Sequence, residues 1–229
     1  MKLIFFGDSL IEGSYGGSFV AGVASLLPGH TIIGAGESGN TVINLLNRLD
    51  AVLEEEPDGI FVMCGGNDAI SYSQPETRRY YRRVQKIPDG IVTPDAFARS
   101  YRDLLTRIQL AHIRAWVGLP PMEYNPETVA ALKQYNALAR EAADSLSIPV
   151  LDLMTRLNPE RIPPRPPLDR QAIRLVGQRQ ESGWSDYETE RQRGGFTYTF
   201  DGLHLTPEAA QRVAQLVVEF LAQHVPELT

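Results

Sequence analysis

Three residues of this 229-residue chain have the types needed to activate a nucleophile. Ser9 follows a run of large apolar residues at positions 3–6, and Asp201 and His204 stand three positions apart near the other end of the chain. A serine hydroxyl is too weakly acidic to attack a carbonyl carbon unaided, but a neutral imidazole oriented by a carboxylate can remove its proton. The three side chains therefore predict acyl transfer, provided that the fold brings them together.

Each of these residues also has a purely structural interpretation. The hydroxyl of Ser9 can cap the next helix by accepting a backbone N–H, and the spacing alone favours this interpretation. The segment from Asp201 to His204 can be a surface turn with a solvated histidine. The choice depends on what the other loops place beside Ser9.

A second candidate loop, residues 64–68, ends another apolar run. Its paired glycines let the backbone approach a ligand closely, and the amide of Asn67 can donate hydrogen bonds without carrying a charge. Asn67 is also an ordinary turn residue after glycine, and Asp68 can form an Asx turn or brace the loop. Cys64 is interpreted as a small buried apolar residue.

The glycine-rich stretch at residues 34–39, GAGESG, favours a different class of function. It follows an expected strand, precedes a helix and has the glycine spacing of a dinucleotide fingerprint. Such a fingerprint normally lies in the first strand-to-helix turn, where this chain has Ser9. Asp58, near the separation expected for a ribose-binding acid, precedes the next strand instead of ending it. A nucleotide-binding α/β protein is therefore kept as the alternative.

The elements that must position these residues alternate between apolar runs and segments of helical periodicity, which is typical of repeated βαβ units. Right-handed crossovers would then place helices on both faces of one five-stranded parallel sheet, giving a three-layer α/β/α sandwich in one domain over residues 1–229. Strands are expected at residues 2–6, 30–34, 59–64, 113–119 and 149–153.

Three helix starts share the same local chemistry. Each has a capping side chain, then a proline whose missing N–H costs nothing, then an acid at the positive end of the helix dipole. They are Thr93-Pro94-Asp95, Asn125-Pro126-Glu127 and Thr206-Pro207-Glu208.

Two segments, at about residues 71–93 and 154–199, interrupt the alternation and are expected to be irregular insertions near the rim of the active site. They contain 13 of the 22 Lys and Arg residues but only 8 of the 28 Asp and Glu residues. These cations can attract an anionic substrate, pair with an acidic surface in a homo-oligomer, or merely solvate a loop. Four of them are Arg78, Arg79, Arg82 and Arg83.

Composition limits the remaining function classes. The net charge of −6 argues against a general nucleic-acid binder, and no apolar run approaches the length of a membrane span. The single cysteine excludes an internal disulfide, and the histidines show no metal-ligand spacing. With no signal peptide visible, we expect a cytoplasmic protein that needs neither a metal nor an organic cofactor.

Four short segments of the chain match, in order, the four motif blocks of a known family. The chain resembles the SGNH/GDSL hydrolase superfamily, whose motif blocks are GDS(L), an SG-containing loop, GxND and DxxH. The matching segments are Gly7-Asp8-Ser9-Leu10, Ser38-Gly39-Asn40-Thr41, Gly65-Gly66-Asn67-Asp68 and Asp201-Gly202-Leu203-His204.

The resemblance implies a flavodoxin-like sheet and a role for each matched residue. Ser9 matches the nucleophile, and Asp201 and His204 match the rest of the catalytic triad. The backbone N–H groups of Ser9 and Gly39 and the side-chain amide of Asn67 match the donors of an oxyanion hole.

The predicted reaction is hydrolysis of a small or short-chain carboxylic ester through a covalent acyl-enzyme. Carbohydrate O-acetyl esters, lysophospholipids and thioesters remain alternatives with the same mechanism, because discrimination depends on pocket shape. A carbohydrate-binding protein without catalytic activity is a further alternative. Gly34 and Glu37 depart from the family pattern, and Glu37, Trp184 and Tyr187 are the candidate pocket residues.

Overall fold

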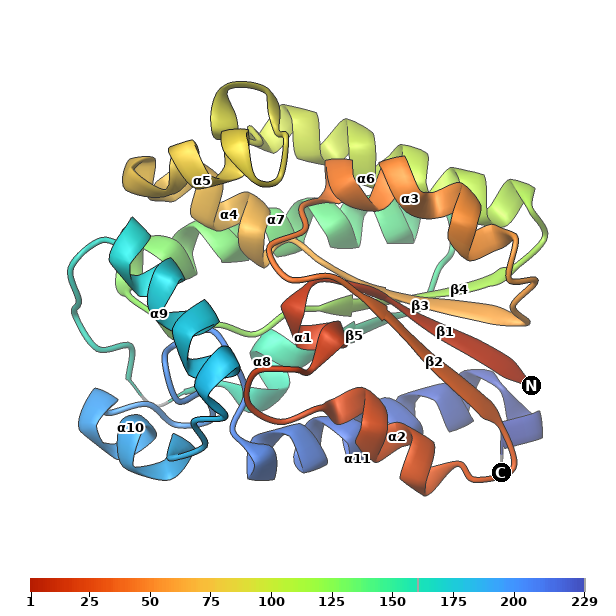
Figure 1. Ribbon diagram of the computed structural model, residues 1–229. Helices are drawn as coiled ribbons and strands as arrows, with labels where there is room; N and C mark the ends of the chain where they lie inside the picture. Colours follow the sequence, from red (N-terminus) through yellow and green to blue (C-terminus); the bar gives the residue numbers. More distant parts are fainter. Residues whose placement is uncertain (160, 229) are drawn as a thin grey trace.

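The computed structural model describes residues 1–159 and 161–228, and a parallel five-stranded sheet lies at its centre (Figure 1). The strand order β2-β1-β3-β4-β5 is the flavodoxin-like order. All five predicted strands are confirmed to within two residues. They are β1 Lys2–Gly7, β2 Thr31–Gly36, β3 Gly59–Met63, β4 Arg114–Leu119 and β5 Val150–Asp152.

Helices cover both faces of the sheet, which makes the three-layer α/β/α sandwich that the sequence predicts (Figure 1). The layer with α3, α4, α6 and α7 lies on one face, and α2 and α11 lie on the other. None of the described helices is long and apolar enough to cross a membrane. The helices are α1 Ser9–Glu12, α2 Phe19–Leu26, α3 Val42–Leu53, α4 Gly66–Ser73, α5 Arg78–Arg83, α6 Pro94–Leu110, α7 Pro126–Ser145, α8 Leu153–Leu157, α9 Arg170–Ser182, α10 Tyr187–Gly194 and α11 Pro207–His224.

The three predicted helix starts are confirmed. Helices α6, α7 and α11 each begin at the proline, and the side chains of Thr93, Asn125 and Thr206 each accept a backbone N–H from the third residue beyond. Because these caps need only local sequence, they fix the helix starts without tertiary contacts.

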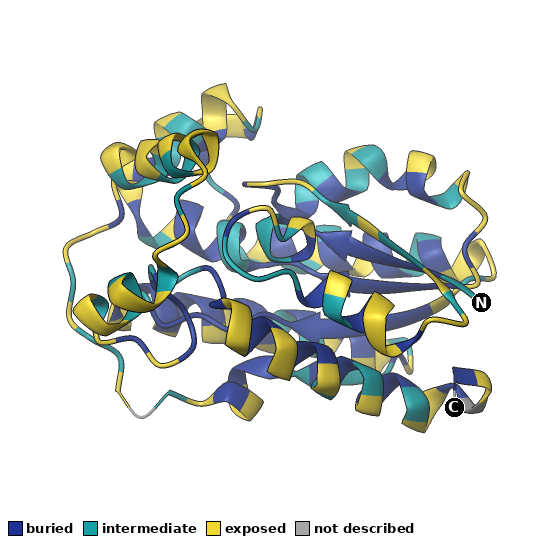
Figure 2. Cartoon of the chain, turned by 60° about the horizontal axis from the view of Figure 1, so that its bottom comes forward, coloured by how far each residue is buried: buried dark blue, intermediate teal, exposed yellow. Residues whose placement is uncertain are grey.

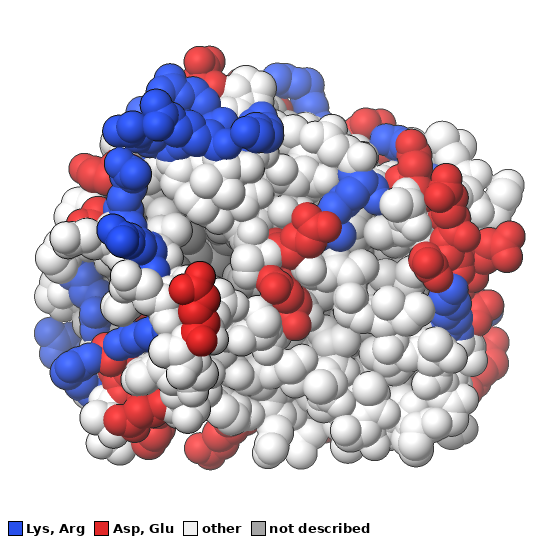
Figure 3. Space-filling model, in the orientation of Figure 1, with Lys and Arg blue, Asp and Glu red and all other residues white. Residues whose placement is uncertain are grey.

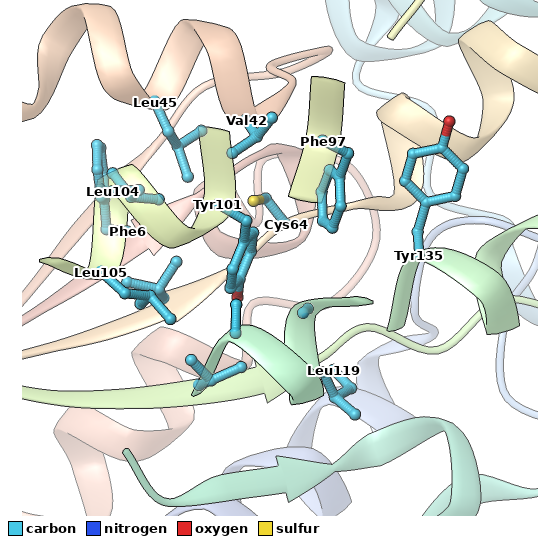
Figure 4. Packing of buried hydrophobic residues seen from close by; sticks show 14 of the residues in the cluster. Phe6, Val42, Leu45, Cys64, Phe97, Tyr101, Leu104, Leu105, Leu119 and Tyr135 are labelled. Atoms are coloured by element: carbon cyan, nitrogen blue, oxygen red, sulfur yellow. The ribbon is translucent and has the colours of Figure 1, made fainter. Parts of the chain in front are cut away.

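Two apolar clusters sandwich the sheet, and alternate residues of each central strand enter opposite clusters. From β1, Ile4 and Phe6 face α3 and α6, whereas Leu3 and Phe5 face α2 and α11. Figure 2 shows the central strands and the inner sides of the helices as buried, whereas the edge strand β2 is intermediate to exposed. Figure 4 shows the buried free thiol of Cys64 among apolar side chains, as the sequence predicts.

The two segments that we expected to be irregular contain short helices, and that expectation is corrected. Residues 71–93 include α5, and residues 154–199 include α9 and α10; residue 160 lies outside the described residues. Helix α9 has local end signals, because Asp169 caps its start and Gly183 ends it with a φ of +67°. No residue of α9 is buried, and its apolar side chains Ile173, Leu175 and Val176 lie outside the two main apolar clusters.

Candidate active site

The site begins at the carboxyl end of β1, beside β3, where the strand order reverses and ligands bind in open α/β sheets. Ser9 is the first residue of α1, and the cap of that helix is Asp8, whose Oδ1 accepts the N–H of Leu10 at 3.0 Å. The interpretation of Ser9 as the cap is therefore wrong. Its hydroxyl instead lies close to a histidine from the other end of the chain.

Ser9, His204 and Asp201 form a continuous chain of contacts. The Oγ of Ser9 lies 3.1 Å from Nε2 of His204, and Nδ1 of His204 lies 2.7 Å from Oδ2 of Asp201. The other carboxylate oxygen of Asp201 accepts the backbone N–H groups of Leu203 and His204 at 2.9 and 2.8 Å. A compact turn thus holds the acid and the imidazole against each other, and this arrangement can activate a hydroxyl.

The electrostatics of this pair favour an ionised Asp201 beside a basic imidazole. Burial lowers the pKa of His204, but the charge of Asp201 and its hydrogen bond outweigh burial and raise that pKa above its ordinary value. Burial raises the pKa of Asp201, and the contacts with His204 more than reverse this effect. With Nδ1 bonded to the carboxylate, Nε2 of the neutral ring faces Ser9 as an acceptor.

The side chain of Asn67, at the start of α4, is fixed at both ends of its amide. Its Oδ1 accepts the hydroxyl of Tyr81 at 2.8 Å, and its Nδ2 donates to Oδ2 of Asp8 at 3.3 Å. Burial raises the pKa of Asp8 to about 6. No local sequence pattern indicates the role of Tyr81, which comes from α5 in the first insertion.

The loop that follows β2 is shaped around Gly39. The φ of Gly39 is +81°, and a Cβ there would collide with the hydroxyl of Tyr80 and the amide of Gln85. The same Gln85 amide donates to the carbonyl of Ser38 and to Tyr80, both at 3.0 Å. Only glycine accommodates both the backbone conformation and this close packing against the first insertion.

Arg48, on α3, joins the end of β1 to the Gly39 loop, and sequence reasoning missed it. Its Nη2 donates to the carbonyl of Gly7 at 2.6 Å, and its Nε donates to Oδ1 of Asn40 at 2.8 Å. Its guanidinium also stacks on the ring of Phe6, 4.6 Å from the ring centre. The contact with Gly7 spans a large separation in sequence, so no local pattern could have indicated it.

Glu123 is a second residue that sequence reasoning missed. It is completely buried after β4, and its Oε1 accepts the backbone N–H groups of Tyr198 and Thr199 at 2.9 and 2.7 Å. The same oxygen accepts the Thr199 hydroxyl at 2.7 Å, and both carboxyl oxygens lie within 3.0 Å of the N–H of Thr197. Glu123 therefore holds the segment that leads into Asp201.

Asp68 braces a neighbouring helix. Its buried carboxyl oxygens lie 3.1 and 3.3 Å from the N–H of Val42, the first residue of α3. Burial raises the pKa of Asp68 to about 8. The alternative of a brace is therefore the one that the structure supports, although the braced element is α3 and not the loop of Asp68.

A cavity of about 420 Å³ opens in front of Ser9. Side chains from the two insertions form much of the cavity wall. They include Tyr80, Leu168, Ile173, Val176 and Phe196. The predicted site residues that the structure brings together on this wall are Ser9, Gly39, Asn67, Asp201 and His204.

Three predicted pocket residues, Glu37, Trp184 and Tyr187, lie outside this wall. The side chain of Glu37 is 63% exposed and lies 3.9 Å from Nε of Arg48. The expectation that Glu37 lines the pocket is corrected, because Gly39 and Ser38 turn towards the cavity in its place.

Trp184 and Tyr187 form an aromatic layer behind the cavity wall. Their ring centres lie 5.9 and 4.7 Å from that of Phe200, and both rings also pack against Tyr15. Tyr15 in turn meets the ring of His204 edge-on at 5.0 Å. Their expected role as pocket walls is therefore corrected to packing behind Tyr15 and Phe200, which do line the cavity.

The structure does not support the nucleotide-binding alternative. Gly34 and Gly36 belong to β2, and a Cβ on Gly36 would collide with backbone atoms of Asp8, Ile11 and Glu12. Gly36 thus allows α1 to pack closely on β2, where the fingerprint would need space for a pyrophosphate.

Comparisons with known proteins identify the family to which the chain belongs. The model of the GDSL-like Lipase/Acylhydrolase family matches residues 5–212, and the chain belongs to that family. It is therefore a hydrolase that acts on carboxylic esters. A comparison with curated protein sequences gave no match.

Solved structures with the same fold span nearly the whole chain. The acetyl xylan esterase AlAXEase has 18% identity and a TM-score of 0.65, with 96% of this chain and 98% of that chain covered. A lipase/acylhydrolase from Enterococcus faecalis has 19% identity and a TM-score of 0.63, with 97% and 96% covered. A variant of Axe2, an acetyl xylan esterase from Geobacillus stearothermophilus, has 17% identity and a TM-score of 0.64, with 96% and 94% covered. At these identities the likeness establishes the fold.

Proposed function

We propose that the chain hydrolyses its ester through Ser9 as the nucleophile, with His204 as the base and Asp201 as the acid that orients the base. The observation that supports this most directly is the relay of two contacts, 3.1 Å from Ser9 to His204 and 2.7 Å from His204 to Asp201. These three side chains supply the nucleophile and the proton transfers that ester hydrolysis requires.

The reaction proceeds in two halves. The imidazole of His204 takes the hydroxyl proton while Oγ of Ser9 bonds to the ester carbonyl carbon, and the C=O bond becomes a C–O⁻ single bond. His204 then gives the proton to the leaving alkoxide as the carbonyl re-forms on an acyl-Ser9 intermediate. Water, deprotonated by His204, attacks the acyl carbon. His204 then returns the proton to Oγ of Ser9 as the bond between Oγ and the acyl carbon breaks, which releases the carboxylic acid.

Three donors are proposed to bind the oxyanion: the N–H groups of Ser9 and Gly39, and Nδ2 of Asn67. All three residues lie on the cavity wall, and the contacts of Asn67 with Tyr81 and Asp8 direct Nδ2 towards Asp8, the residue before Ser9. Donors aimed at developing negative charge are each worth roughly 10²–10³-fold in rate.

The cavity favours a small or short-chain ester. Its volume of about 420 Å³ suits a compact substrate, and much of its wall is apolar. Besides the site residues, the polar side chains on the wall include two arginines, Arg165 and Arg179, and also Ser38, Gln180 and Glu190. A carbohydrate O-acetyl ester is a second candidate, because two of the similar structures are described as acetyl xylan esterases. A panel of esters that varies acyl length and leaving group separates these candidates from lysophospholipids and thioesters.

Covalent labelling tests the mechanism. A fluorophosphonate should attach to Ser9 of the wild-type protein, and peptide mass spectrometry should locate the adduct there. The Ser9→Ala variant should keep its thermal transition and lose both labelling and ester hydrolysis. Labelling of another residue, or full activity in the folded variant, would contradict the assignment of Ser9.

A further inference from the structure

A group of exposed arginines lies beside the active-site cavity, on both insertions. Arg79, Arg82 and Arg83 stand on α5, and Arg170 and Arg174 stand on α9. We call these five residues the arginine band. Figure 3 shows basic side chains running from α5 down over α9, along one side of a hollow in the surface.

The band crosses between two helices that are far apart in sequence. Positive charge from Arg83, Arg170 and Arg82 lowers the pKa of Arg79, which places α9 cations within electrostatic reach of α5. Arg79 and Arg83, like Arg170 and Arg174, are four residues apart on a helix, a spacing at which like charges repel. The fold therefore concentrates cations here against their mutual repulsion.

Among residues 1–159 and 161–228, none of the five guanidinium groups lies within 4.0 Å of a carboxylate. Two arginines of α10, in the second insertion, do have acidic partners: Arg191 pairs with Glu188, and Arg193 pairs with Glu190. Arginines of α10 are thus neutralised within the fold, whereas the charge of the arginine band is left for an external anion.

The α9 end of the band adjoins the active-site cavity. Arg170 and Arg174 line a hollow together with Tyr80 and Ile173. Tyr80 and Ile173 also line the cavity that contains Ser9 and His204, so the hollow and the cavity adjoin. Arg170 and Arg174 therefore lie beside the wall of the cavity that contains Ser9.

We propose that the arginine band is a subsite for an anionic group on the substrate, which makes this chain selective for esters that carry a carboxylate or a phosphate away from the reacting carbonyl. Guanidinium groups suit both anions, because their planar N–H donors pair with two oxygens at once. This inference rests on the proposed esterase function and adds the charge class of its substrate. Since the overall charge of −6 repels anions, attraction of an anionic substrate requires a local cationic region of this kind.

Matched pairs of esters test the subsite. One arm uses 4-nitrophenyl monoesters of dicarboxylic acids of increasing length, which place a carboxylate on the acyl group. The other arm uses acetate esters of phenols that carry a carboxylate or a phosphate, which place the anion on the alcohol. Each anionic ester is compared with an uncharged analogue of the same length, and the measured quantity is the ratio of their kcat/KM values.

For at least one pair, kcat/KM of the wild-type protein should be about tenfold higher for the anionic ester than for its uncharged analogue at low ionic strength. This ratio should fall as salt is added. The ratio should drop towards one in Arg79→Gln/Arg83→Gln and in Arg170→Gln/Arg174→Gln. The control Arg99→Gln/Arg102→Gln changes the charge by the same amount on α6 and should keep the wild-type ratio.

The outcomes separate this inference from the proposed function. Failure to hydrolyse any ester of the panel, anionic or uncharged, would overturn the proposed function, and calorimetric titration of the anionic esters into Ser9→Ala would still test the subsite. Hydrolysis without preference for any anionic member, or an equal loss in the α6 control, would overturn the subsite. A change in oligomeric state of the band variants at an unchanged ratio would also overturn it, since the band would then be a subunit contact.

Discussion

At the scale of single residues, the site depends on orientation as much as on residue type. Asn67 can present either its oxygen or its nitrogen to the cavity, and only the nitrogen can bind an oxyanion. The hydroxyl of Tyr81 donates to Oδ1 and the carboxyl group of Asp8 accepts from Nδ2, so the two contacts together favour the orientation in which Nδ2 faces Asp8. Tyr81 is therefore a positioning residue for the proposed oxyanion hole.

Tyr81→Phe should lower kcat roughly fivefold to tenfold and leave KM nearly unchanged, because one hydrogen bond worth about 1 kcal/mol no longer fixes the amide. Steady-state kinetics on a neutral ester measures this effect. In an Asn67→Ala background the same substitution should have no further effect. Tyr101→Phe is the matched control, because Tyr101 is also buried and its hydroxyl has no partner among the described residues.

The pH dependence of turnover follows from the raised pKa of His204. An imidazolium cannot take the proton of Ser9, so kcat/KM should fall as pH decreases through the pKa of His204, with a midpoint above the ordinary value of 6.5. Glu12 contributes to this raised pKa by its charge. Glu12→Gln should therefore move the acid limb to lower pH, and a shift to higher pH would contradict this electrostatic assignment.

At the scale of elements, the turn that contains Asp201 and His204 is held by a residue from another loop. Glu123 receives its hydrogen bonds from the segment at residues 197–199, and its own N–H donates to the carbonyl of Gly202 at 3.0 Å. The loop between β4 and α7 thus helps to hold Asp201 and His204 in place.

Glu123→Gln places an NH₂ group where one carboxyl oxygen accepts the N–H of Thr197, so two donors face each other. We expect a loss of about 1–3 kcal/mol in the free energy of unfolding and a lower kcat at an unchanged KM. Denaturant unfolding and steady-state kinetics measure the two effects. The control Glu141→Gln, at an exposed position of α7, should change neither the free energy of unfolding nor kcat. If Glu123→Gln behaves like this control, the contacts of Glu123 with residues 197–199 do not support the site.

At the scale of the whole molecule, one sheet between two apolar clusters brings distant strand ends together, and we propose that the chain folds as a single domain. This packing also buries carboxyl groups, among them one that stays protonated near neutral pH. Asp68, with its pKa raised by burial to about 8, holds a proton that the unfolded chain releases near pH 4. The contribution of Asp68 to stability is therefore present at low pH and is lost as pH rises towards 8.

Asp68→Asn removes this titration and keeps an oxygen that can accept the N–H of Val42. The free energy of unfolding of the variant, relative to wild type, should therefore rise between pH 4 and pH 8, by roughly 2 kcal/mol or more. Urea unfolding across this pH range measures the difference. A difference between Asp68→Asn and wild type that does not change with pH would contradict the raised pKa.

The amino-acid sequence by itself determined the strands, the three helices that begin at a proline and the α/β/α layering. Apolar periodicity and helix capping act over a few residues, so they can be recognised without the tertiary structure. It also indicated Ser9, Gly39, Asn67, Asp201 and His204, because each stands in a short motif at the end of an element.

Only the tertiary structure decided which residues orient and enclose that set. Tyr81, Arg48 and Glu123 act through partners that are 14, 41 and 76 residues away in sequence, so no local pattern can reveal them. The cavity wall likewise depends on how the insertions pack, which moved Trp184 and Tyr187 from the expected wall to the layer behind it. The physical reason is that hydrogen-bond geometry and close packing are properties of side chains brought together by folding.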